Sequence, residues 1–329
     1  MRVLVTGANG FVGSAVCRYL LSSGLNVRAA VRNESISNVP GRGGASWETF
    51  VSGNIGPSTE WQQSLTGVDV VIHAAARVHV MRERSSDPLT EFRAVNTAGT
   101  ERLAREAARC GAQRIVYLSS IKVNGENTRP STPFRETDLP SPQDPYAVSK
   151  CEAEAALRRV GEQTGLEVVI VRPPLVYGPR VKGNIATMLS WAYRGIPLPL
   201  AAISNARSLV ALENLCSFLH SCTIKPAAAG ETFLAGDTNA LSTAELFRML
   251  SAGMGKQARL YSVSEPLLKV AFACCGLHRI YRRLCQSLVV DTQKAADRLG
   301  WCAPVEAQRA LEQTGEWYVK SRRRSAGKG

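Results

Sequence analysis

The first fourteen residues, MRVLVTGANGFVGS, constrain the fold more than any other stretch of the chain. Apolar and β-branched residues lead into a turn with Gly7, Gly10 and Gly13, and an amphipathic stretch begins near Phe11. This order predicts a strand, a phosphate-binding loop and a helix. Gly7 permits a sharp turn, Gly10 leaves space for a pyrophosphate beside the backbone, and Gly13 lets the helix pack closely on the strand. We therefore predict a dinucleotide site, with phosphates at the positive end of the helix dipole.

Strand-like and helix-like segments alternate as far as residue 172. Further strands are predicted at 25–31, 47–51, 67–73, 114–119 and 167–171, and helices at 89–110 and 146–164. This alternation predicts an α/β fold with a Rossmann-like, doubly wound parallel sheet. Pro173 and Pro174 then break the rhythm, because proline lacks the donor that a central strand needs.

The remainder of the chain is predicted to be mostly helical, at 184–194, 212–222, 243–254, 266–284, 292–299 and 305–318. We assign residues 1–172, with about 208–236, to the dinucleotide-binding domain, and 173–207 and 237–318 to a smaller substrate-binding region. The cleft between them, at the carboxyl ends of the strands, is the expected site. The basic tail 319–329 is predicted to be disordered.

The formal charge of the 329 residues is +13, which raises the question of nucleic acid as a partner. Five of the positive charges, however, lie in the last ten residues: Lys320, Arg322, Arg323, Arg324 and Lys328. The tail indicates a solvated end, with an electrostatic tether to an anionic surface as the alternative. The remaining +8 suits ligands that carry several phosphates, so no nucleic-acid partner is expected.

Composition also bears on compartment and metal content. The longest apolar stretch, 266–277, is interrupted by Lys269 and is too short to span a bilayer, and no secretory leader precedes the first strand, so we expect a cytoplasmic protein. Nine scattered cysteines lack metal-ligand spacing and are expected to be reduced. His73 lies within the apolar run VVIHAAA and is expected to be a packed residue, so no metal site is predicted.

Three residues are candidates for proton transfer. Tyr146 and Lys150 are four residues apart near the start of a predicted helix, which places them on one helix face. Ser120 follows a predicted strand, so its hydroxyl is expected at the same cleft edge. An ammonium about 4 Å from the phenol would contribute about 4 kcal/mol at an effective dielectric of about 20, which would bring the pKa of Tyr146 near neutrality. Taken singly, each motif is also compatible with an ordinary turn or helix surface.

Together these motifs resemble the extended short-chain dehydrogenases/reductases of the NAD-dependent epimerase/dehydratase family, which act on nucleotide sugars. The resemblance covers about residues 1 to 317 and rests on TGANGFVGS, HAAA, VNTAGT, LSSIKVNG, DPYAVSK and RPPLVYGP. It implies that Ser120 polarises the substrate oxygen, that Tyr146 transfers the proton, and that Lys150 tunes Tyr146 and binds ribose. Implied cofactor contacts are Gly7, Gly10, Phe11, Val12, Asn54, Ile55, Ala74, Ala75, Tyr146, Lys150 and Pro173.

The resemblance also implies a nucleotide-sugar site. Arg207 occupies the place of the family arginine that grips the pyrophosphate, Asn184 lies in the segment that covers the nucleotide, and Arg282 or Arg283 would reach the distal phosphate. Lys122 and Asn124 are assigned to the sugar, although they depart from the residues commonest in 4-epimerases. For the arginines and Asn184 the alternative is a solvated surface position. Asn54 stands where relatives usually carry an aspartate beside the adenine, and it retains hydrogen-bonding capacity.

The end of the second predicted strand bears on the cofactor. NAD-binding relatives carry an Asp or Glu there, whereas this chain has Arg32, with Arg28 nearby. An arginine clamps a 2′-phosphate, which favours NADP(H), with NAD(H) as the alternative. KVNG with RPPLVYGP resembles a bacterial subgroup of UDP-sugar 4-epimerases and 4-ketoreductases of surface-polysaccharide synthesis.

Since a reductase consumes NADPH, we rank reduction of a UDP-linked 4-keto-hexose above UDP-hexose 4-epimerisation. The alternative of another class is a non-catalytic regulator that senses a dinucleotide. A homodimer is kept open as the assembly state.

Overall fold

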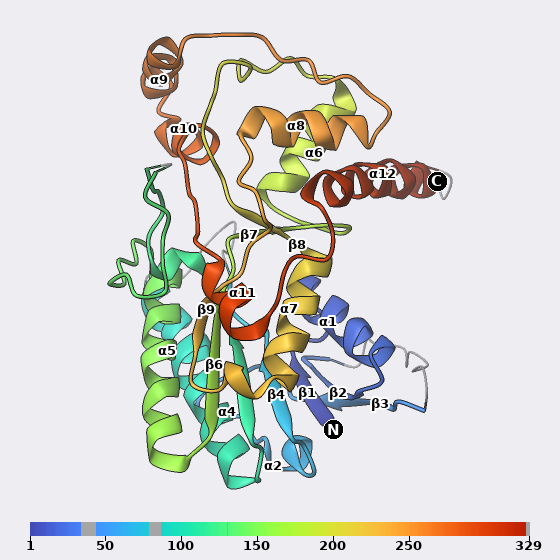
Figure 1. The fold of residues 1–329 in the computed structure, drawn as a ribbon, viewed down its shortest axis with the longest axis vertical. Helices are drawn as coiled ribbons and strands as arrows, with labels where there is room; N and C mark the ends of the chain where they lie inside the picture. Colours follow the sequence, from blue (N-terminus) through green and yellow to red (C-terminus); the bar gives the residue numbers. More distant parts are fainter. Residues whose placement is uncertain (34–43, 79–86, 130, 327–329) are drawn as a thin grey trace.

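The computed structural model describes the chain except residues 34–43, 79–86, 130 and 327–329. Its centre is a seven-stranded parallel sheet (Figure 1). The strands run, in spatial order, β3 (Trp47–Val51), β2 (Asn26–Val31), β1 (Arg2–Thr6), β4 (Val70–His73), β5 (Arg114–Leu118), β6 (Glu167–Arg172) and β9 (Thr232–Leu234). The predicted parallel, doubly wound α/β fold is confirmed.

Both faces of the sheet are covered by helices, which explains the continuous apolar strands. On one face, α1 (Phe11–Ser22), α7 (Leu212–Ile224) and α11 (Gln293–Leu299) pack on strand side chains in one core. On the other face, α2 (Gln62–Leu65), α4 (Gly99–Arg109) and α5 (Pro145–Thr164) bury a second core. All four residues of β4 are buried as a result.

The strand order reverses at β1, which lies between β2 and β4. In open parallel sheets a ligand crevice forms at such a switch point, outside the carboxyl ends of the strands. The loops that carry the predicted site residues leave β1, β4, β5 and β6 at this edge.

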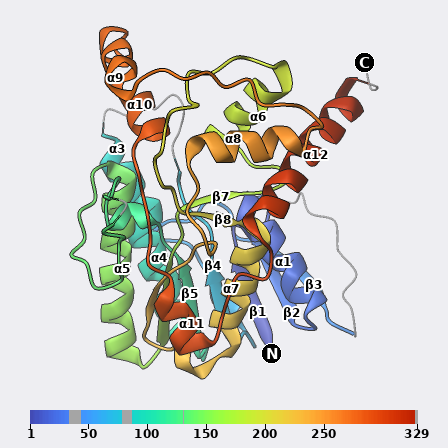
Figure 2. The same ribbon diagram turned by 45° about the horizontal axis from the view of Figure 1, so that its top comes forward.

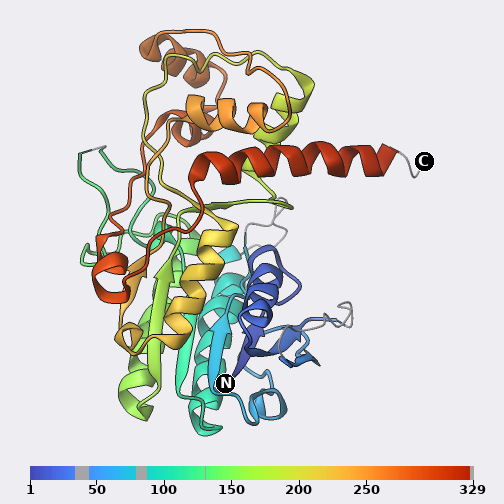
Figure 3. The ribbon, with the colours of Figure 1, turned by 45° about the vertical axis from the view of Figure 1, so that its right-hand side comes forward.

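A second group of elements lies beyond the carboxyl edge of the sheet (Figure 3). The short strands β7 (Leu175–Tyr177) and β8 (Leu209–Ala211) pair there, and α6 (Asn184–Arg194), α8 (Thr243–Ala252) and α12 (Ala307–Ala326) share a core of their own. Helix α8 begins with a capping box in which Ser242 and Glu245 satisfy each other's backbone N–H groups. The smaller, mostly helical part of the chain thus lies beyond the sheet edge at which the predicted site residues are placed.

Two predicted helices are each divided into shorter segments in the structure. The predicted helix 89–110 comprises α3 (Pro88–Phe92), a π-helical segment Arg93–Ala98 and α4. The predicted helix 266–284 is two helices, α9 (Glu265–Cys274) and α10 (His278–Cys285), because Gly276 adopts a φ of 68° that ends the first. Two short 3₁₀ turns, Ile121–Val123 and Pro226–Ala228, complete the elements.

The predicted disorder of the basic tail is wrong for residues 319–326, because α12 continues to Ala326 (Figure 2). Contacts one turn apart support the extension: Arg322 lies 5.3 Å from the centre of the Tyr318 ring, and Lys320 pairs with Glu316 at 3.3 Å. Residues 327–329 lie outside the described part. No helix among the described residues has the length and apolar content needed to cross a bilayer.

Candidate active site

The glycine loop forms a tight cradle between β1 and α1. Gly7 has a φ of 67°, and its carbonyl oxygen accepts a hydrogen bond from the Gly10 N–H at 2.8 Å. A Cβ on Gly13 would lie 2.2 Å from that oxygen, so only glycine fits there. Gly10 is the N-cap of α1 and provides no side-chain cap. The first N–H groups of the helix are therefore available to an anion, and the cradle fits a dinucleotide pyrophosphate.

The loop after β4 lies directly against this cradle. A Cβ on Gly7 would lie 2.9 Å from the Cα of Ala75, and the Ala75 N–H donates to the Thr6 hydroxyl at 3.2 Å. His73 is hydrogen-bonded at both ring nitrogens, to Thr6 at 2.6 Å and Thr100 at 2.9 Å. Burial, with the nearby Lys150 charge, lowers the pKa of His73 to about 3. His73 is thus a neutral, packed residue that fixes the loop carrying Ala74 and Ala75.

The end of β2 carries Arg32 as an exposed residue that forms no ion pair with the described part of the chain. Arg28 has a different role: it pairs with Glu48 at 2.7 Å and donates to the carbonyls of Ser64 and Thr66. Of these two arginines, Arg32 is therefore the one that is available to bind a phosphate at this strand end.

The other predicted cofactor residues differ in burial and in the elements that they contact. Asn54 is exposed, and Ile55 packs on the start of α4, where a Cβ on Gly99 would meet it at 2.8 Å. Phe11 and Val12, both partly buried on α1, pack against the substrate-side core and the sheet core respectively. Pro173 is buried after β6, and its carbonyl accepts the Ile121 N–H at 3.0 Å.

The three candidate catalytic residues lie where β5 ends and α5 begins. The Tyr146 hydroxyl hydrogen-bonds the Ser120 side chain. The Lys150 ammonium donates to the Leu118 carbonyl at 2.7 Å and lies 4.3 Å from the centre of the Tyr117 ring. Lys150 is only 1% exposed.

The near-neutral pKa expected for Tyr146 is wrong. Burial, reinforced by the Asp144 carboxylate, raises the pKa of Tyr146 to about 12, although its hydrogen bond with Ser120 acts in the opposite direction. Burial also lowers the pKa of Lys150 to about 7, against the opposing effect of Glu154. The desolvation of both groups outweighs the attraction that the sequence estimate considered alone. Tyr146 is consequently a protonated phenol at neutral pH, suited to donate a proton.

A buried network that the sequence analysis missed lies behind these residues. Glu154 on α5 is 1% exposed and forms a two-point ion pair with Arg172, at 2.6 and 2.9 Å. The Ser119 hydroxyl donates to the same carboxylate at 2.5 Å. The network thus connects the neighbours of Ser120 and Pro173 to α5. Its one sequence signal is the spacing of Glu154, four residues after Lys150 on the same helix face.

Asn124 belongs to this network and not to an open sugar site. It is 2% exposed, its side-chain oxygen accepts from Arg172 at 2.9 Å, and its amide donates to the Arg135 carbonyl at 2.9 Å. The assignment of Asn124 to substrate is therefore wrong, because the residue is buried and both its amide group and its side-chain oxygen hydrogen-bond to protein groups. Lys122 pairs with Asp144 and, at 3.4 Å, with Glu126.

The predicted nucleotide-binding residues belong to the smaller region. Arg207 is largely buried, donates to the Gln286 carbonyl at 2.8 Å, and forms no ion pair within the described residues. Burial lowers its pKa, so an anionic ligand would compensate the cost. Asn184 is exposed at the start of α6. Arg282 is partly exposed and lies 3.6 Å from Glu126.

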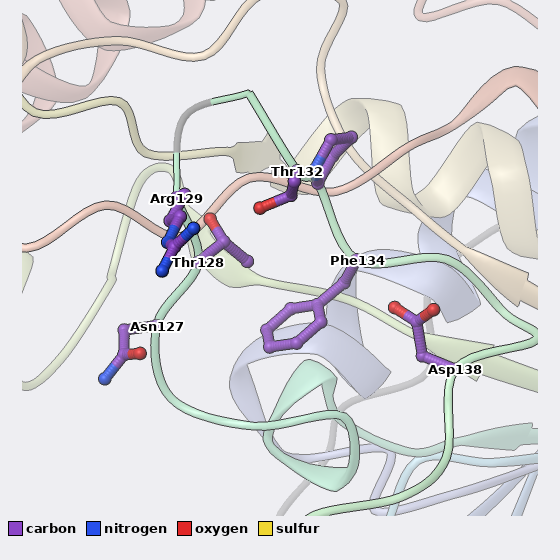
Figure 4. Close-up of a pocket in the computed structure, with 7 residues that line it drawn as sticks. Asn127, Thr128, Arg129, Thr132, Phe134 and Asp138 are labelled. Atoms are coloured by element: carbon purple, nitrogen blue, oxygen red, sulfur yellow. The ribbon is translucent and has the colours of Figure 1, made fainter.

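A hollow of about 510 Å³ lies in the loop between β5 and α5 (Figure 4). Its lining residues are Asn127, Thr128, Arg129, Thr132, Pro133, Phe134 and Asp138. The loop is fixed to the chain after α10, because Phe134 and Val289 share a backbone hydrogen bond of 2.8 Å. None of the residues predicted from the sequence lines this hollow, so it is not the predicted site. Among the described residues no cluster of His, Cys, Asp or Glu could hold a metal ion.

Comparison with known proteins agrees with this geometry. The model of the NAD dependent epimerase/dehydratase family matches residues 3–236. The chain belongs to this family. It is 38% identical to a UDP-glucose 4-epimerase of Vibrio cholerae over 324 residues, which is 98% of this chain and 97% of that protein. It is therefore an enzyme of the short-chain dehydrogenase/reductase type.

Solved structures show the same fold. One is a dTDP-glucose 4,6-dehydratase, DesIV of Streptomyces venezuelae, with NAD and TYD bound; it is 26% identical, covers 98% of each chain and has a TM-score of 0.76. Another is a UDP-glucuronic acid 4-epimerase of Bacillus cereus in complex with NAD, at 21% identity and a TM-score of 0.76, covering 97% of this chain and 99% of that one. The family enzyme described here therefore has the fold of nucleotide-sugar enzymes that bind NAD.

Proposed function

We propose that this family member reduces the C4 carbonyl of a UDP-linked 4-keto-hexose with NADPH, to supply a sugar for bacterial surface-polysaccharide synthesis. The observation that carries the proposal is Arg32, an exposed cation without an ion-pair partner in the described chain, at the strand end where a carboxylate would select NAD. A guanidinium there suits the 2′-phosphate of NADP(H). A freely exchanging NADPH suits a reductase, because each turnover consumes one reduced cofactor.

The residues around Tyr146 suit reduction. The glycine loop would hold NADPH, which would supply the hydride. Tyr146, whose pKa is about 12, is protonated at neutral pH and donates its proton to the C4 oxygen. Ser120, already hydrogen-bonded to Tyr146, orients that oxygen. Lys150 then stabilises the phenolate when the ammonium is charged, as it is below its pKa of about 7.

We assign the UDP moiety to the smaller region. A diphosphate beside Arg207 would supply the negative charge that this largely buried guanidinium lacks in the described structure. Asn184 at the start of α6 and Arg282 on α10 complete the proposed nucleotide contacts, and Lys122 is assigned to the sugar side. The UDP-sugar name of the Vibrio cholerae relative supports this substrate class.

A second candidate is UDP-hexose 4-epimerisation with retained NAD. The name of the Vibrio cholerae relative, at 38% identity over nearly the full length, favours it. The two candidates differ in net cofactor use. Purified protein is supplied with a UDP-4-keto-hexose and NADPH or NADH, and separately with a UDP-hexose without added cofactor. Oxidation of NADPH supports the reductase; interconversion of hexose epimers without NADPH consumption establishes the epimerase instead.

We also propose that the enzyme works in the cytoplasm. All nine cysteines are free thiols in the structure, including the exposed pair Cys274 and Cys275. A reducing compartment keeps such neighbouring thiols reduced.

Changing Arg32 to Asp is expected to reverse the cofactor preference. The substitution removes a charge-assisted contact with the 2′-phosphate and introduces a carboxylate that accepts from ribose hydroxyls. We expect the ratio of NADPH to NADH affinity to fall by about 10- to 150-fold. Fluorescence titration with each reduced dinucleotide measures it.

Arg18→Asp is the matched control, because Arg18 is an exposed residue of α1 and its replacement changes the net charge equally. That variant is expected to keep the wild-type preference. An Arg32→Asp protein that retains the preference for NADPH would show that this arginine does not read the 2′-phosphate.

Changing Arg207 to Ala is expected to weaken binding of UDP and of the UDP-sugar alike, by about 10- to 150-fold, because both lose the same charge-assisted contact. NADPH affinity is expected to change little. Isothermal titration with free UDP and with NADPH measures the two effects separately. Arg194→Ala, which removes an exposed arginine at the end of α6, is the control. Equal losses for both ligands would instead assign Arg207 a structural role.

A further inference from the structure

Helices α9 and α10 and the turn between them carry exposed apolar side chains that the active site does not use. Leu267 and Val270 on α9 are 61% and 58% exposed. Leu277, just before α10, is 43% exposed, and Ile280 on α10 is 40% exposed. We call these four residues the α9 ridge. Tyr261, on the segment that leads into α9, is also 51% exposed.

The opposite side of α9 is already occupied by protein. Leu268 is buried with Tyr281 and Cys285 of α10, and the Phe272 ring lies 6.1 Å from that of Tyr281. Helix α9 is therefore apolar on its packed side and on its exposed side. Exposed apolar side chains of this size, beside the charged Lys269 on the same helix, form a surface that another apolar phase is suited to cover.

The segment that carries the ridge has a charge of one predominant sign. Residues 256–283 contain six basic residues, Lys256, Arg259, Lys269, Arg279, Arg282 and Arg283, and one acidic residue, Glu265, which gives a net charge of +5. The carboxylate of Glu265 accepts a hydrogen bond from the Tyr281 hydroxyl at 3.0 Å. Lys269 and Arg283 are exposed on α9 and α10 themselves. An anionic surface would complement this segment.

The ridge is also placed where a flat surface can reach it. Helix α9 lies at one end of the long axis of the molecule, at the opposite end from the amino edge of the sheet (Figures 1 and 3). The long axis is vertical in Figure 1, and no other labelled helix extends further at that end. A planar surface therefore meets α9 without contacting the Rossmann-like domain.

We propose that the α9 ridge docks this enzyme on an anionic lipid surface. Leu267, Val270, Leu277 and Ile280 enter the boundary between headgroups and acyl chains, while the exposed Lys269 and Arg283 contact lipid phosphates. This is the arrangement of an interfacial amphipathic helix, which lies on a membrane and does not span it. Docking would hold the enzyme where membrane-bound glycan assembly consumes its product class.

Charge distinguishes this occupant from a second copy of the chain. A symmetric contact of ridge against ridge would bring two segments of net charge +5 together, and like charges at such a contact oppose association. A lipid headgroup layer supplies negative charge and apolar area at once. Lipid therefore satisfies both properties of the ridge.

The test is co-sedimentation of the full chain with vesicles of phosphatidylcholine alone or with about one third phosphatidylglycerol. We expect binding to the anionic vesicles that weakens as salt is raised. The double variant Leu267→Gln, Val270→Gln is expected to lower the partition coefficient by at least about tenfold, and Lys269→Glu to lower it on anionic vesicles by about tenfold. Both changes are at exposed positions, so thermal melting should stay near that of the wild type.

Leu139→Gln and Arg159→Glu are the matched controls, since Leu139 is 88% exposed outside the ridge and Arg159 is exposed on α5. They are expected to leave vesicle binding unchanged. Absence of binding to anionic vesicles, or equal losses in ridge and control variants, overturns the proposal. Light scattering on the same proteins tests self-association. If the wild type does not bind vesicles and a ridge variant changes the oligomeric state, the ridge is a self-association surface, and the lipid proposal is overturned.

Discussion

Tyr146→Phe is expected to lower the turnover number by about 10²- to 10⁴-fold, the range that a positioned proton donor contributes. The variant loses only the hydroxyl that hydrogen-bonds Ser120. The ring remains, and with it the edge contact to Phe92, whose ring centre lies 6.1 Å away. Dinucleotide affinity and melting temperature are therefore expected to change little. Steady-state turnover, cofactor titration and thermal melting on one preparation separate the chemical effect from a folding defect.

Ser120→Ala is the companion variant, because it removes the partner of the same hydrogen bond and leaves the phenol in place. It is expected to retain more activity than Tyr146→Phe, since Ser120 orients the substrate oxygen and does not lose a proton to it. Unchanged turnover in Tyr146→Phe would contradict the assignment of Tyr146 as the proton donor. Loss of cofactor binding in that variant would instead indicate a structural role for the hydroxyl.

The architecture was predictable because local patterns determine it. The apolar run at Val70–His73 indicates a strand that is buried on both faces. Pro173 ends the strand before it because proline lacks a backbone N–H. The strand at Trp47–Val51 and the helix at Asn184–Arg194 were predicted with the bounds that the structure has. The division of α9 from α10 was missed because a glycine within an apolar run is a weak signal until its φ is known.

The electrostatics of the site were less predictable, since they depend on burial and on partners distant in the sequence. Spacing placed Tyr146 near Lys150, but the pKa of each is governed by desolvation. Asn124 was assigned to substrate because it follows Ser120, whereas its partner Arg172 lies 48 residues away. A pattern of residue types along the chain does not reveal which side chains meet in three dimensions.

Among the contacts that the sequence does not reveal, the buried ion pair between Arg172 and Glu154 has the largest expected effect on stability. Arg172→Met is expected to lower the free energy of unfolding by about 3–5 kcal/mol, because it leaves the Glu154 carboxylate buried without its principal cation. Turnover is also expected to fall, since Ser119 donates to that carboxylate and adjoins Ser120. Urea unfolding at neutral pH measures the first effect, and steady-state kinetics measures the second.

The double variant Arg172→Met, Glu154→Leu is expected to recover most of the lost stability, because it removes both buried charges together. Arg105→Met is the control: Arg105 pairs with Glu101 at 2.8 Å, but on the exposed side of α4, where such a pair contributes at most about 0.5 kcal/mol. If Arg172→Met lowers the free energy of unfolding no more than Arg105→Met does, burial does not increase the contribution of the Arg172–Glu154 pair to stability. If stability returns in the double variant while turnover stays low, the ion pair positions the catalytic strand ends, because the fold no longer requires its charges but the chemistry does.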